Sequence, residues 1–175
     1  MSASWLNLGF ASQYAPPPVR TMTPEVMTQN VGLSGANTAR YMRTDGADTI
    51  NRIRVRVGTS SGDISVAVYA STTSSGAPVP GARLATSGAV ACPASGDATI
   101  VIDDTVVVPN GSWMGLSADN TSATFLSGPS GAAGSSMGSG RLLGSSTATH
   151  PLPDPGNALS TGVLGRHFAM IGVLA

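Results

Sequence analysis

The stretch TINRIRVRVGTSSGDISVAVYA, residues 49–70, decides the fold class of this chain. In its first half, Ile53, Val55 and Val57 alternate with arginines, which is the pattern of a β-strand with one buried face and one polar face. Residues 60–63 then have the composition of a tight turn, and the alternation resumes after them. Residues 49–70 therefore predict either a β-hairpin or two adjacent strands joined by a short loop.

Similar segments recur along the rest of the chain. Further strands are expected at 81–91, 97–102, 105–108, 112–118, 121–126 and 166–174. The adjacent Asp103 and Asp104 are expected in a turn between two of these strands. Turn residues recur about every 10 to 15 positions, and no long stretch has a helical stripe. The pattern predicts an all-β fold, an antiparallel two-sheet β-sandwich of jelly-roll type.

The N-terminal region has a different composition. Residues 1–37 predict an extended arm, because Pro16, Pro17 and Pro18 favour a polyproline conformation. A short helical turn is expected at 23–29, where Thr, Pro and Glu follow one another in the order that suits a helix start.

Residues 38–175 predict the sandwich domain itself. Within it, residues 127–157 predict a long Gly/Ser/Pro-rich loop, since 13 of the 20 residues from Ser127 to Ser146 are Gly or Ser. Such a segment buries too little apolar area to offset the entropy lost when it becomes ordered.

Charge and composition exclude several functions. Only 10% of the 175 residues are charged, all nine basic residues are arginine, and the formal net charge is zero. A neutral chain lacks the basic surface of a nucleic-acid binder, and the absence of lysine excludes a P-loop lysine and Schiff-base chemistry. Cys92 is the only cysteine, so no intrachain disulfide is expected. No secretory signal or membrane-spanning run is recognisable, which predicts a protein made in a cytoplasm without membrane insertion.

No motif makes a convincing active site. The GSSMG motif at 134–138 would make Ser136 a nucleophile with His150 or His167 as its base, but it lies in low-complexity sequence where chance matches are common. Two histidines without a third nitrogen or sulfur ligand do not make a zinc site. The acidic residues do not form a pair suited to glycoside hydrolysis. We expect no catalytic residue, no metal and no cofactor.

The clearest charged feature is a row of arginines. At alternate positions, Arg52, Arg54 and Arg56 share one strand face and extend over about 13 Å. The row suits an interface with another protein, attraction to an anionic polymer such as teichoic acid or lipopolysaccharide, or simply a solvated face. Together with Arg20 and the three prolines of the arm, these arginines are our interface candidates.

A tryptophan in the segment SWMGLSA, residues 112–118, is a second candidate site. If Met114, Leu116 and Ala118 face the core, Trp113 points the other way. It would then stack on a sugar ring, or it would be covered by the arm or by a neighbouring subunit. The candidate glycan contacts are Tyr69, Trp113, Asp119 and Asn120.

Five segments carry a likeness to a known family. They are INRIRVRVG (50–58), ISVAVYA (64–70), GAPVPGARL (76–84), VVVPNGSWMGL (106–116), and LPDP (152–155) followed by the closing strand. Over about residues 38–175 the chain resembles a β-sandwich module of bacteriophage virion structural proteins, found in tail-fibre, minor tail and head accessory proteins. These are packing and turn motifs, so the resemblance implies a fold and a place on the virion but no active site.

The resemblance implies an accessory protein that decorates or cements the capsid, or attaches to the tail or a fibre through subunit contacts. Its expected partners are the major capsid or tail proteins and other copies of itself, with trimers favoured. The alternative is a module that binds a carbohydrate or host receptor on the virion surface. We expect assembly in the bacterial cytoplasm and no nucleic-acid partner.

Overall fold

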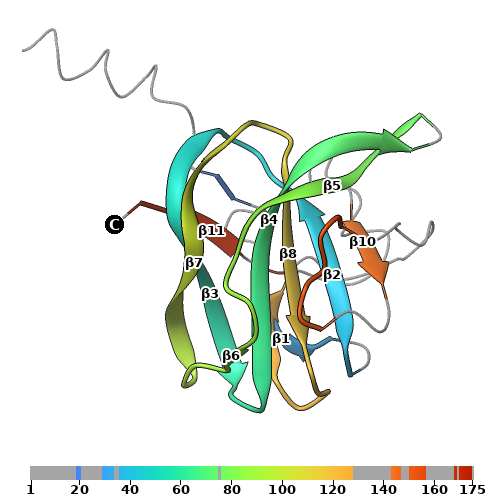
Figure 1. The fold of residues 1–175 in the computed structure, drawn as a ribbon. Helices are drawn as coiled ribbons and strands as arrows, with labels where there is room; N and C mark the ends of the chain where they lie inside the picture. Colours follow the sequence, from blue (N-terminus) through green and yellow to red (C-terminus); the bar gives the residue numbers. More distant parts are fainter. Residues whose placement is uncertain are drawn as a thin grey trace, which may run out of the picture.

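The computed structural model describes residues 19–20, 29–33, 36–74, 76–127, 143–146, 150–156, 168 and 170–174. These residues contain strands and no helix (Figure 1). The strands are β1 (Gln29–Gly32), β2 (Thr38–Arg43), β3 (Asp48–Thr59), β4 (Asp63–Ser74), β5 (Ala77–Thr86), β6 (Val90–Ala91), β7 (Gly96–Val108), β8 (Trp113–Ala118), β9 (Thr124–Ser127), β10 (Leu143–Ser146) and β11 (Met170–Val173). The described residues have no helix long and apolar enough to cross a membrane.

The strands form two antiparallel sheets that pack face to face. In the first, called the β3 sheet, β3 pairs with β7, β9 and β11, and β9 also pairs with β1. In the second, called the β4 sheet, the order is β10-β2-β8-β4-β5, and β6 pairs with β4. The predicted all-β sandwich is therefore confirmed.

Of the two alternatives predicted for 49–70, the hairpin is wrong, and two strands joined by a short loop are found instead. Both strands exist, but β3 belongs to one sheet and β4 to the other, so the loop at 60–62 crosses between the sheets. Gly62, with φ of 57°, allows the sharp change of direction there. The two strands do not pair because each already has partners along both of its edges.

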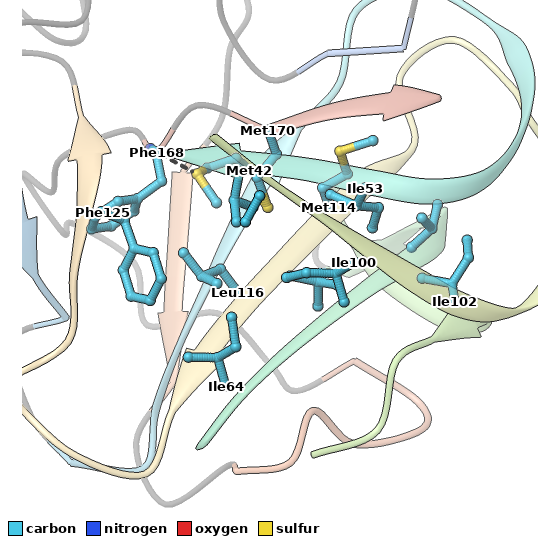
Figure 2. Close-up of a cluster of buried hydrophobic side chains, with 14 of the residues drawn as sticks. Met42, Ile53, Ile64, Ile100, Ile102, Met114, Leu116, Phe125, Phe168 and Met170 are labelled. Atoms are coloured by element: carbon cyan, nitrogen blue, oxygen red, sulfur yellow. Dashed lines mark hydrogen bonds between the residues drawn. The ribbon is translucent and has the colours of Figure 1, made fainter. Parts of the chain in front are cut away.

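The core fills the space between the sheets. Alternate residues of β3, such as Ile53, Val55 and Val57, face the alternate residues of β4 and β8. Figure 2 shows Phe125 and Phe168 at one end of this cluster, in an edge-to-face contact with 6.2 Å between ring centroids. The backbone N–H of Phe168 donates to the Met42 sulfur at 3.1 Å. On β3, the alternation in the sequence therefore does produce one buried face and one exposed face.

The N-terminal boundary of the domain lies earlier than residue 38. Val19 is fully buried in the core, and β1 pairs with β9, so residues 19–20 and 29–33 are part of the sandwich rather than of an arm. The composition of residues 30–37 is that of a loop, but pairing with β9 gives β1 the backbone hydrogen bonds of a strand. The three prolines at 16–18 lie outside the described residues, as does all of the expected helical turn except Gln29, which begins β1.

Two further expectations need correction. The expected turn at Asp103 and Asp104 is absent: β7 continues through both, and Asp103 Oδ1 accepts a hydrogen bond from the Thr86 N–H at 2.8 Å. The expected loop at 127–157 contains β10, which pairs with β2 from Ala39 to Met42. In both places, neighbours distant in sequence determine the local conformation.

Candidate functional site

The outer face of the β4 sheet is covered by the chain itself. Residues 150–156, which we call the strap, lie across this face. Leu152 of the strap is 1% exposed and completes a second apolar cluster with Ala39, Tyr41, Ala67, Tyr69 and Trp113. Tyr41 and Tyr69 meet edge to face in this cluster, with 5.5 Å between ring centroids.

Polar contacts fix the strap in place. The Tyr69 hydroxyl donates to the carbonyl of Pro153 at 2.9 Å, and Arg83 Nη1 donates to the carbonyl of Leu152 at 2.7 Å. The backbone N–H of Arg83 donates to Asp154 Oδ1, and the N–H of Gly156 donates to the Gly81 carbonyl, both at 2.9 Å. Burial raises the pKa of Tyr69, so its hydroxyl stays protonated and remains a donor.

The strap removes the two aromatic glycan candidates from the surface. The predicted direction of Trp113 is correct, because Met114 faces the core and Trp113 faces the opposite side of the sheet. However, Trp113 and Tyr69 are both 0% exposed, and the Trp113 Nε1–H donates to Ser71 Oγ at 3.3 Å. We expected the arm or a neighbouring subunit to cover Trp113 if no sugar did. In the structure, Leu152 of the strap packs on it instead. The hypothesis that Trp113 and Tyr69 offer their rings to a sugar is therefore wrong.

The two polar glycan candidates fasten a loop. Asn120 Oδ1 accepts hydrogen bonds from the backbone N–H groups of Ser122 and Ala123, and its Nδ2 donates to the Ser61 carbonyl. Asp119 Oδ1 accepts from the Asp63 N–H at 3.1 Å. Asp119 is exposed, but this oxygen already has a partner at Asp63, the first residue of β4 after the loop that joins the two sheets.

These contacts predict a pH effect on stability. Hydrogen bonds from Asn120 and from the Asp63 N–H lower the pKa of Asp119 below its ordinary value of about 3.9. A lowered folded-state pKa contributes stability above the unfolded-state value, and this is lost as pH falls through the folded-state value. In urea unfolding between about pH 5 and about pH 2, the wild type should lose more stability than Asp119→Asn. Parallel stability curves for the two proteins would contradict this.

The structure describes only one of the three candidate catalytic residues, His150. Ser136 and His167 lie outside the described residues. His150 Nδ1 lies 3.0 Å from Ser117 Oγ, but Ser117 is 0% exposed, so its hydroxyl is closed to a substrate. Across the described ranges, no three His, Cys, Asp or Glu side chains come close enough to hold a metal ion.

The outer face of the β3 sheet, by contrast, is open. Arg52, Arg54 and Arg56 are all exposed along β3, while the residues between them are buried. On the β7 side they lie opposite Val101, Thr99 and Asp97, respectively.

The same face also holds the fourth arginine candidate. On the β11 side of β3, Ile171 lies opposite Arg54 and Val173 lies opposite Arg52. Arg20 in turn forms a bridge with Ile171, and directly opposed antiparallel residues share a sheet face. We call this surface the arginine face: Arg20, Arg52, Arg54 and Arg56, with Val101, Ile171 and Val173 among them.

The other described arginines serve the fold. Arg40 is 8% exposed, Arg43 Nε donates to the Gly111 carbonyl at 3.2 Å, and Arg83 holds the strap. On the arginine face, Arg56 Nη1 lies 3.6 Å from Asp97 Oδ1, and both side chains are more than half exposed. An exposed pair of this kind contributes little to stability. The arginine face is therefore not explained by folding.

The fold and this surface define the class of the protein: a two-sheet β-sandwich with its own chain packed on one outer face and with exposed arginines on the other. Comparisons with protein-family models, with curated proteins and with solved structures give no match to this chain.

Proposed function

We propose that this chain is a non-enzymatic structural protein of a bacteriophage virion. In this proposal it is an accessory β-sandwich that decorates or cements the capsid, or attaches to the tail or a fibre, through subunit contacts. The motif resemblance given above suggests this habitat.

One observation carries the attachment role: the two outer faces of the sandwich differ. The strap packs on the outer face of the β4 sheet through Leu152, whereas Arg52, Arg54 and Arg56 of the arginine face are exposed, as is Val101 (62%). Arginine beside exposed aliphatic side chains is typical of protein interfaces. A face that folding does not need, with this composition, favours attachment to another protein. Homo-oligomers, with trimers favoured, remain part of the proposal and are tested by light scattering of the purified chain.

The alternative, a glycan-binding module, has less support. Its two aromatic candidates are buried, and stacking on a sugar needs an accessible ring face. Asp119 and Asn120 could still contact a ligand, but without an aromatic platform among the described residues they offer only an exposed carboxylate and amide.

Particle occupancy tests the proposal. The chain should co-purify with particles on a density gradient, and a tagged copy should label one location in negative stain. Thr99 lies opposite Arg54 in the middle of the arginine face, so Thr99→Trp should block docking by its bulk and lower occupancy about tenfold or more.

The matched control is Thr73→Trp, at an exposed position on the β4–β5 hairpin, which projects at the upper right of Figure 1. Both substitutions are at the surface and should change folding stability by no more than about 0.5 kcal/mol. A chain found only outside particles contradicts the virion role. Equal occupancy of the two tryptophan variants contradicts attachment through this face.

A further inference from the structure

The charge on the arginine face is unbalanced at its centre. Arg56 has Asp97 as its cross-strand neighbour, and Arg20 has Asp45. Arg52 and Arg54 instead lie between apolar or hydroxyl side chains on both sides. Two guanidinium groups at the spacing of alternate strand residues, about 7 Å, therefore lack an opposing carboxylate across either neighbouring strand.

The neighbours of these two arginines are largely aliphatic. Arg52 lies between Val101 and Val173, and Arg54 has Ile171 on one side. Ile171 and Val173 are half-buried and Val101 is mostly exposed, so apolar area remains open to a partner. A polyanion without apolar groups, such as a sulfated polysaccharide or a nucleic acid backbone, would leave these side chains uncovered.

A second copy of the same face is also a poor fit. Face-to-face pairing would bring arginines from both copies together, and like charges at an interface disfavour association. The planar fork of arginine matches a carboxylate through two parallel hydrogen bonds, which requires carboxylates on the other side.

We infer that the partner of the arginine face is an acidic protein surface, one that presents carboxylates at alternate strand positions with aliphatic side chains between them. Arg52 and Arg54 would each bind a carboxylate, and Val101 would be covered by the aliphatic groups. This inference rests on the proposed attachment role and adds the chemistry of the partner.

Defined peptides test it by fluorescence anisotropy. One peptide alternates Glu with Val, a second alternates Glu with Ser, and a heparin oligosaccharide represents polyanions without apolar groups. At an ionic strength of about 0.15 M, the Glu/Val peptide should bind about tenfold more tightly than the other two probes. The double variant R52A/R54A should lose about tenfold or more for the Glu/Val peptide.

Two variants separate the charge from the apolar contribution. Val101→Ser should remove the preference for Glu/Val over Glu/Ser. R52K/R54K keeps the charge but loses the fork, and should recover only part of the affinity that R52A/R54A loses. Thr73→Ala on the hairpin should bind as the wild type does.

The inference is overturned by heparin binding as tight as that of the Glu/Val peptide, by unchanged affinity in R52A/R54A, or by a wild-type dimer that the double variant dissociates. Its failure is distinguishable from failure of the proposed function. If Thr99→Trp lowers particle occupancy but R52A/R54A does not, the face is correct and the acidic partner is wrong.

Discussion

Replacing Trp113 by alanine should destabilise the protein by about 3–5 kcal/mol, the range for large aromatic side chains removed from a core. Trp113 is 0% exposed and is among the largest fully buried side chains. Its loss leaves a cavity against Tyr69 and Leu152 and removes the donor to Ser71 Oγ. Because the cluster lies between the β4 sheet and the strap, both would lose packing.

Chemical denaturation followed by circular dichroism measures this effect, and Val101→Ala is the matched control. Val101 is 62% exposed, so its truncation should change the free energy of unfolding by no more than about 0.5 kcal/mol. A Trp113→Ala protein as stable as the wild type would show that the strap does not pack on the indole. It would also reopen the interpretation of Trp113 as a ligand-binding residue.

The sequence predicts which side chains of a strand are buried, because that depends on the strand's own residues alone. Side chains alternate between faces along a single strand, so Ile53 and Val55 could be assigned to the core, and Arg52 and Arg54 to the outside, from sequence alone. Strand partners are a different matter. The pattern at 49–70 is equally compatible with a hairpin and with a crossover between sheets, and the choice depends on β7, β8, β9 and β11, which are distant in sequence.

The candidate site was predictable to the same extent. The row of three arginines follows from the period of the strand, but Arg20 joins it only because its segment lies beside β11. The direction of Trp113 was predictable, whereas its cover was not. Leu152 stands between two prolines in a connector otherwise rich in turn residues, but a single apolar residue is common on protein surfaces and does not by itself indicate a docking point.

The strap should detach when Leu152 is replaced by alanine, with a loss of about 2–5 kcal/mol, the range for buried leucines. Leu152 packs over Gly115, where an added Cβ would lie 3.1 Å from Leu152 Cδ1. Since Gly115 has no side chain to fill the space, truncation of Leu152 leaves a cavity. The strap's hydrogen bonds to Tyr69 and Arg83 would then have to hold it without an apolar anchor.

Hydrogen exchange and tryptophan emission follow the detachment directly. The Gly156 N–H, which donates to the Gly81 carbonyl, should exchange faster in Leu152→Ala. In a Trp5→Phe background, Trp113 is the only tryptophan, and its emission should shift to the red as the indole meets water. The matched control is Val107→Ala at an exposed position, which should change neither the exchange rate of the Gly156 N–H nor the emission of Trp113. If the Gly156 N–H of Leu152→Ala exchanges no faster than the amides of the core strands, which open only by global unfolding, then the strap unfolds only with the sandwich, and it is an integral layer of the fold.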